Sequence, residues 1–153
     1  MTTAAPTEAL FYHLERQPLE TVLPQLLAMT LKRGWRAVVQ AGTEERLETL
    51  DQHLWTFEDD AFLPHGRKQD GFAERQPVYL TTGTENPNGA TVRFFVDGAQ
   101  PDDPTGYARL VVIFDGRDQT TLAGARELWK QLKAKGCVVT YWQQGDRGWE
   151  KKA

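Results

Sequence analysis

Short apolar runs alternate with amphipathic stretches of ten residues or more, and this alternation limits the fold most strongly. Residues 36–40 (RAVVQ) and 110–114 (LVVIF) are nearly continuous apolar runs, whereas residues 19–30 and 120–135 repeat apolar side chains at helical spacing. Strands of that kind are covered by helices on both faces. Strands that alternate with helices indicate βαβ units and a mainly parallel sheet. We therefore predict a single three-layer, Rossmann-like α/β domain over residues 1–153.

The expected elements follow from local signals along the chain. Pro18 opens the first helix and Gly34 ends it, so Pro24 must lie in its first turns or bend it. Thr43 caps a second helix whose apolar stripe is Leu47, Leu50 and Leu54. The remaining expectations are strands at 8–14, 78–82, 91–96, 110–114 and 138–142, an irregular stretch at 55–76, and a polar tail from 143. The consecutive strands within 78–96 would bring an antiparallel element into the sheet.

The composition excludes several classes of function. The chain has no serine, so no serine-nucleophile mechanism is available, and its single cysteine cannot form an internal disulfide or a cysteine zinc cluster. A formal net charge of −3 does not favour direct nucleic-acid binding. No apolar run approaches the ~18–20 residues of a membrane span. The first ten residues lack the pattern of a signal peptide, so we expect a cytoplasmic protein with no membrane partner.

No motif for a cofactor or a metal is present. The first expected strand is followed by Glu15-Arg16-Gln17-Pro18, without the glycines that let a backbone approach a phosphate. The three histidines, at positions 13, 53 and 65, are not spaced as metal ligands. We predict no cofactor and no metal site from these patterns.

Asp115 and Asp118 follow the most apolar strand and allow two interpretations. Two carboxylates at the carboxyl end of a strand can hold Mg²⁺, which would make the protein a Mg²⁺-dependent phosphotransferase or hydrolase. Alternatively, Asp115-Gly116 forms a turn and Asp118 precedes or caps the next helix. The spacing alone leaves both open.

Charge is unevenly distributed along the chain. From Asp115 onward there are eight basic and five acidic residues, whereas the first 114 residues have ten and sixteen. Arg126, Trp129, Lys130 and Lys133 share one side of the expected third helix. A tryptophan among cations suits a ligand that is both anionic and apolar, such as an acidic peptide. The alternatives are a solvated cationic face with Trp129 against the core, or direct binding of single-stranded DNA.

Two segments resemble the chi subunit of bacterial DNA polymerase III. Residues 48–66 (ETLDQHLWTFEDDAFLPHG) show that family's helix ending in L-W, a short acidic stretch, and then F-[LV]-P-H. Residues 114–136 (FDGRDQTTLAGARELWKQLKAKG) resemble its A-R-x-x-[WY]-K helix. The similarity spans nearly the whole chain, including FYHL near the N-terminus and RGWRAVVQ at 33–40.

The resemblance implies a non-catalytic accessory subunit of the clamp-loader complex. Its partners would be the psi subunit and the acidic C-terminal tail of the single-stranded-DNA-binding protein, which ends in aspartates, a hydrophobic residue, proline and phenylalanine. In the matching positions, Arg126 would meet the terminal carboxylate, beside Trp129 and Lys130. The aromatic wall of the tail pocket would be Trp55, Phe62, Pro64 and His65. Leu122 stands near a position where some members have lysine, so that part of the basic rim is either missing or supplied by Arg117 or Lys133.

Overall fold

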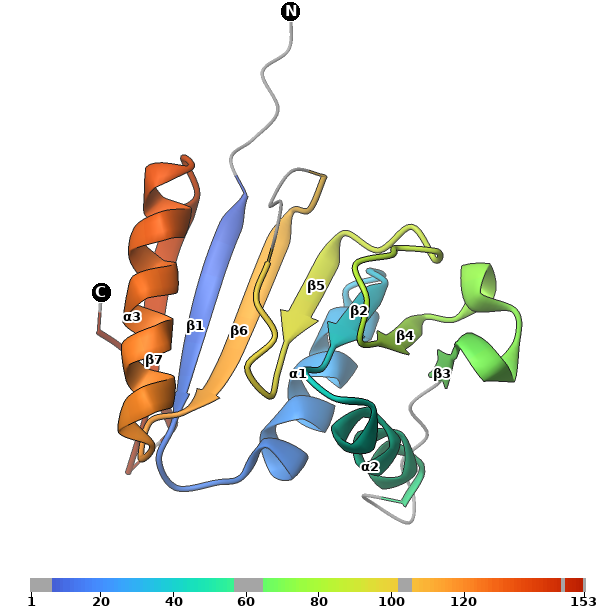
Figure 1. Ribbon diagram of the computed structural model, residues 1–153, viewed down its shortest axis with the longest axis horizontal. Coiled ribbons are helices and arrows are strands. Elements are labelled where there is room, and N and C mark those ends of the chain that lie inside the picture. The colour runs from blue at the N-terminus through green and yellow to red at the C-terminus, as the bar shows by residue number, and fades with distance from the viewer. Residues whose placement is uncertain (1–6, 57–64, 102–105, 147, 153) are drawn as a thin grey trace, which may run out of the picture.

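An eight-stranded sheet forms the middle layer of the protein (Figure 1). The computed structural model describes residues 7–56, 65–101, 106–146 and 148–152. The sheet order is β3-β4-β2-β5-β6-β1-β7-β8. The strands are β1 Glu8–Leu14, β2 Ala37–Gln40, β3 Gly66–Arg67, β4 Val78–Thr81, β5 Val92–Phe95, β6 Arg109–Asp115, β7 Val138–Gly145 and β8 Gly148–Lys151. The helices are α1 Leu19–Lys32, α2 Glu44–Thr56 and α3 Gln119–Ala134, with short 3₁₀ helices at Lys68–Asp70 (η1) and Ala73–Arg75 (η2).

The three-layer, Rossmann-like arrangement is confirmed by alternation within the strands. Val111 and Ile113 of β6 join the core that α1 and α2 cover, whereas Leu110, Val112 and Phe114 join the core under α3. Successive strand side chains point to opposite faces, so the apolar run of β6 serves both cores. The sheet is mainly parallel, as predicted.

The antiparallel element lies elsewhere than predicted. β4 and β5 do not pair with each other, because β2 lies between them and is parallel to both. The antiparallel pair is β7 with β8, in the segment predicted to be a polar tail. β8 is covered only at Trp149, which is partly buried and packs edge-on against Tyr12, with ring centroids 4.9 Å apart. Gly148, Glu150 and Lys151 are exposed. This limited burial explains why the segment has no apolar run.

Loops, not a helix, cover part of the face on which α3 lies. Val38 and Tyr79 on that face pack against Ala90. The loops are held by Arg93, which is buried on β5 and donates hydrogen bonds to Gln40 Oε1, the carbonyls of Gly83 and Glu85, and the Tyr107 hydroxyl. A buried guanidinium requires such partners, and these fix the two loops to the sheet.

Pro24 lies in the middle of α1, and His53 of α2 compensates for it. Proline has no N–H, so the carbonyl of Glu20 loses its helical donor. The His53 Nε2 lies 2.6 Å from that carbonyl oxygen and donates to it. His53 therefore has a structural role, and its hydrogen bond also joins α1 to α2.

The predicted helix boundaries are confirmed. Gly34 and Gly136 adopt φ values of 81° and 89°, a region that favours glycine, immediately after α1 and α3. The Thr43 hydroxyl accepts a hydrogen bond from the Arg46 N–H at the start of α2. None of the helices in the described ranges has the length and apolarity required to cross a bilayer.

Candidate functional site

The third helix is positioned by its cap and its apolar stripe. Asp118 Oδ1 accepts hydrogen bonds from the N–H groups of Thr120 and Thr121, at 2.9 and 3.3 Å. Ala125, Leu128 and Leu132 are buried against the sheet. This burial sets the rotation of the helix, so Arg126, Trp129 and Lys130 lie along its side.

These last three residues form a surface that we call the α3 face. Arg126 and Lys130 are exposed, and neither forms an ion pair with a carboxylate in the described part of the chain. Trp129 is partly buried and packs edge-on against Phe11 and Tyr141, with centroid distances of 5.6 and 5.9 Å. The face therefore combines free cations with a tryptophan that is held against the core.

A histidine–tyrosine pair lies next to the α3 face, with His13 near the carboxyl end of β1 and Tyr141 in the middle of β7. The Tyr141 hydroxyl is 2.5 Å from His13 Nδ1, and Glu15 Oε1 is 3.2 Å from His13 Nε2. Burial lowers the pKa of His13, and burial raises the pKa of Tyr141. The charge of Arg126 acts on both groups. No local sequence pattern indicates this pair, since its members are 128 positions apart.

A second group of residues, the α2 patch, lies at the end of α2. It consists of Asp51, Trp55, His65 and Arg67. Asp51 Oδ1 is 3.1 Å from His65 Nε2, and Asp51 Oδ2 is 3.1 Å from Arg67 Nε. Trp55 is 51% exposed and its ring lies 4.2 Å from the ring of His65, which is only 3% exposed. The charges of Asp51 and Arg67 are thus paired beneath an exposed tryptophan, with the buried His65 ring against the same carboxylate.

The structure does not bring the α2 patch and the α3 face together. α2 packs against β4 and α3 packs against β6 and β7, on opposite faces of the sheet (Figure 1). β4 and β6 are three strand spacings apart, about 14 Å. Trp55 and His65 therefore do not line the same pocket as Arg126, Trp129 and Lys130. The other two residues assigned to the aromatic wall, Phe62 and Pro64, lie outside the described residues.

Asp115 and Asp118 adopt the turn and cap geometry. Asp115 accepts hydrogen bonds from the backbone N–H and the guanidinium of Arg117, and these bonds hold the pKa of its carboxyl below the usual range. Asp118 is exposed and caps α3. Each carboxylate thus has its own partners. Within the described ranges, no three His, Cys, Asp or Glu side chains are grouped so that they could hold a metal ion. This geometry does not support the Mg²⁺-dependent hypothesis.

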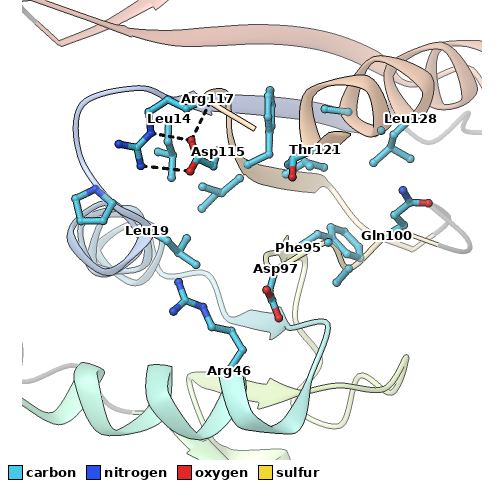
Figure 2. A pocket seen from close by; sticks show the side chains of 18 of the residues that line it. Leu14, Leu19, Arg46, Phe95, Asp97, Gln100, Asp115, Arg117, Thr121 and Leu128 are labelled. Carbon is cyan, nitrogen blue, oxygen red and sulfur yellow. Dashed lines mark hydrogen bonds and ion pairs between the residues drawn. The ribbon is translucent and has the colours of Figure 1, made fainter. Parts of the chain in front are cut away.

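A cleft of about 720 Å³ opens at the carboxyl ends of β1, β5 and β6, between α1, α2 and α3 (Figure 2). Such crevices are the usual ligand sites of open α/β sheets. Both arginines in its wall are neutralised: Arg46 by Glu20, with 2.6 Å between Nη1 and Oε1, and Arg117 by Asp115. Because its residues come from distant segments, the cleft could not be seen in the sequence.

The turn between β1 and α1, where nucleotide-binding relatives of this fold hold a phosphate, is occupied by a side chain of the protein itself. The backbone N–H groups of Glu15, Arg16 and Gln17 all donate to Gln144 Oε1, at 2.9, 2.9 and 3.1 Å. Three converging N–H groups are typical of anion-binding turns. Here an uncharged amide oxygen from β7 satisfies them, so this turn does not present a phosphate site.

Comparisons with known proteins agree with the resemblance found in the sequence. The family model described as DNA polymerase III chi subunit, HolC, matches residues 7–140. A Rickettsia prowazekii (strain Madrid E) protein described as probable DNA polymerase III subunit chi is 26% identical over 102 residues. That match covers 67% of this chain and 58% of the relative, so the chain spans less than two thirds of its length.

Solved structures share the fold at low identity. The C-terminal domain of the DEAD-box protein Dbp5 superposes with a TM-score of 0.60 and 15% identity, covering 93% of both chains. A variant of the S. cerevisiae Dbp5 C-terminal domain, bound to Gle1 and IP6, superposes with a TM-score of 0.57 and 14% identity, covering 92% of both chains. At these identities the likeness supports the α/β fold alone.

Proposed function

Since this chain belongs to the DNA polymerase III chi subunit family, we propose that it is a non-catalytic adaptor of the clamp-loader complex in the cytoplasm. In this role it binds the acidic C-terminal tail of the single-stranded-DNA-binding protein and, through a separate surface, the psi subunit. The tail ends in aspartates, an apolar residue, proline and phenylalanine with a free carboxylate. Such a ligand requires cationic donors next to apolar area.

The observation that carries the tail-binding proposal is the pair of exposed cations beside Trp129. Arg126 and Lys130 have no carboxylate partner in the described part of the chain, so no internal ion pair must be broken when an anion binds. A hydrogen bond between Arg126 and a carboxylate contributes about 1.5–3 kcal/mol. Burying a phenylalanine ring against Trp129 contributes a similar amount, about 1.5–3 kcal/mol. After the entropy of ordering a flexible tail, we expect micromolar affinity, roughly −8 kcal/mol.

The α2 patch supports a second protein contact. Trp55 is half exposed on a base that is fixed by the ion pairs of Asp51 with His65 and Arg67. Tryptophans that are exposed on a rigid base are frequent centres of protein interfaces. The psi subunit is the second partner that the family implies, and we assign it to this patch. The terminal tail motif then contacts the α3 face alone.

Titration of a labelled peptide with the tail's terminal sequence tests the first proposal. Arg126→Ala is expected to weaken binding at least about tenfold, a loss of ~1.4 kcal/mol. Arg75→Ala is the matched control, because it removes the same charge from an exposed arginine on η2, far from α3. Equal effects of the two variants, or no effect of Arg126→Ala, would contradict the assignment.

An amidated peptide separates the terminal carboxylate from the aspartates. The wild-type protein should bind it about as weakly as Arg126→Ala binds the free acid, since the same hydrogen bond is missing. Amidating the peptide and substituting Arg126 together should weaken binding little more than either change does alone. If their effects add fully, Arg126 contacts an aspartate or another group, not the terminal carboxylate. Binding should also weaken as salt is added, because the cations are exposed.

Retention on single-stranded DNA tests the adaptor role against direct DNA binding. The adaptor is retained only on DNA that is coated with the full-length binding protein. Deleting the last residues of that protein should abolish retention, and a pull-down from lysate should show the same loss. Retention on bare DNA would instead support direct binding by Trp129, Arg126 and Lys130.

A further inference from the structure

The hydrogen bond between Tyr141 and His13 has a defined direction. Glu15 Oε1 lies 3.2 Å from His13 Nε2, although Nε2 forms no hydrogen bond within the described residues. A lone pair on Nε2 would be repelled by that carboxylate oxygen, so in the neutral ring the proton is on Nε2. Nδ1 is then an acceptor, and the Tyr141 O–H donates to it across 2.5 Å. In this state the hydroxyl proton of Tyr141 is directed into the protein and is not available to a ligand.

The surroundings of the pair restrict the position of the histidine ring. A Cβ on Gly116 would lie 1.5 Å from His13 Nε2, so the ring fills the space directly above that glycine. Phe114 and Tyr141 flank the ring, with centroids 5.2 and 5.7 Å from it. A second proton on His13 must therefore be accommodated in place. Nδ1–H then becomes the donor, the Tyr141 oxygen accepts, and the Tyr141 O–H is released.

We propose that His13 and Tyr141 form a proton-coupled part of the tail site, in which protonation of His13 frees the Tyr141 hydroxyl to bond the carboxylate held by Arg126. The proton comes from solvent and forms the Nδ1–H bond of His13, and no other covalent bond changes. This inference rests on the proposed tail binding and adds to it. Tyr141 is placed for the role because it contacts Trp129 of the α3 face and the charge of Arg126 acts on it.

The charges around His13 determine the sign of the pH dependence. Burial opposes its protonation and lowers its pKa, Glu15 and Asp115 favour protonation, and Arg126 opposes it. A carboxylate bound at Arg126 adds a negative charge beside the ring, which raises the pKa of His13. Binding therefore takes up a proton, and affinity rises as the pH falls through the interval between the two pKa values.

The experiment is the peptide titration repeated between pH 5.5 and 8.0, where the tail's carboxylates stay ionised. The wild-type protein should bind about tenfold more tightly at the acidic end, the effect expected of one hydrogen bond to a charged group. Tyr141→Phe keeps the ring but removes the hydroxyl, which leaves only the attraction between the protonated His13 ring and the carboxylate. Its affinity should therefore rise much less than that of wild type as the pH falls. Tyr12→Phe, on the opposite face of β1, is the control and should retain the pH dependence.

The outcomes separate this inference from the function on which it rests. Failure of the peptide to bind at any pH would overturn both. Binding that requires Arg126 but is flat in pH, or whose pH dependence is undiminished in Tyr141→Phe, would overturn the His13–Tyr141 role alone. NMR titration of the His13 ring in wild-type protein gives a second measure if Tyr141→Phe does not fold. The midpoint should rise when peptide is added, and an unchanged midpoint would contradict the proposal.

Discussion

The α2 patch and the α3 face contain similar residue types in opposite arrangements. In the α2 patch, Asp51, His65 and Arg67 are enclosed and paired, and the tryptophan is the exposed member. On the α3 face the tryptophan is packed against the core, and Arg126 and Lys130 are exposed. Composition therefore does not distinguish the two surfaces, whereas burial does.

This difference determines what each surface is suited to bind. Free cations attract an anion and speed its encounter, because no internal partner competes for them. An exposed tryptophan over a neutralised base presents apolar area instead and favours a folded protein surface. If this comparison is correct, the charged residues of the α2 patch contribute to stability and its Trp55 contributes to binding. On the α3 face, the charged residues contribute to binding and Trp129 contributes to stability.

The largest effect is expected from Asp51→Ala. It leaves the enclosed His65 and Arg67 without their shared carboxylate, so the free energy of unfolding should fall by about 3 kcal/mol or more. Asp146→Ala, which breaks an exposed pair with Arg16, should cost less than about 1 kcal/mol. Urea denaturation followed by circular dichroism measures both. Similar values would show that the charges of the α2 patch are not enclosed as described.

Gly116→Ala should have the next largest effect, on the other side of the molecule. Its new methyl group would overlap the His13 ring, which Phe114 and Tyr141 flank, so we expect a loss of about 2–3 kcal/mol. Gly124→Ala in α3 is the matched control, because nothing lies within 4 Å of its added Cβ. Alanine should stabilise that helix by roughly 0.5–1 kcal/mol. Thermal unfolding of both variants tests this. A tolerated Gly116→Ala would mean that His13 is free to move.

Truncating each tryptophan compares the two surfaces directly. Trp129→Ala should cost about 2 kcal/mol of stability, since it loses contacts with Phe11 and Tyr141, and it should weaken the tail peptide. Trp55→Ala should cost under about 1 kcal/mol because the side chain is half exposed, and it should leave the peptide affinity unchanged. Its effect should appear in psi binding. Loss of peptide binding in Trp55→Ala would contradict the separation of the surfaces.

The parts of the fold that were predicted correctly depend on local patterns. Helix stripes, glycine ends and caps are set within a few residues, and apolar runs of four or five identify strands that are buried on both faces. The antiparallel prediction for residues 78–96 was wrong because it assumed that consecutive strands pair. The position of β2 between β4 and β5 depends on contacts between segments that are far apart in the chain. The strand β8 was missed because only Trp149 in it is partly buried.

The candidate site also has one part that local sequence patterns predict and another part that depends on long-range contacts. Arg126, Trp129 and Lys130 are close in sequence on one helix, so their shared face was predictable. Their separation from Trp55 and His65 follows from the strand order, which no local motif encodes. The His13–Tyr141 pair, the cleft and the Gln144 contact with the turn after β1 each join segments far apart in the chain. Such contacts require the sheet register, which the sequence does not show.

The smallest expected effect is a pH dependence of stability that originates beside the α3 face. Burial lowers the pKa of His13 in the folded protein below the value of about 6.5 that an unfolded chain shows. The unfolded state then binds more protons in the interval between the two, so stability is full above about pH 6.5 and falls as the pH drops through that interval. His13→Gln should flatten this slope in urea denaturations between pH 5.5 and 8.0, whereas wild type retains it. An unchanged slope in His13→Gln would assign the effect to another group. Saturating tail peptide should also reduce the slope in wild type, because a carboxylate beside Arg126 stabilises the protonated ring.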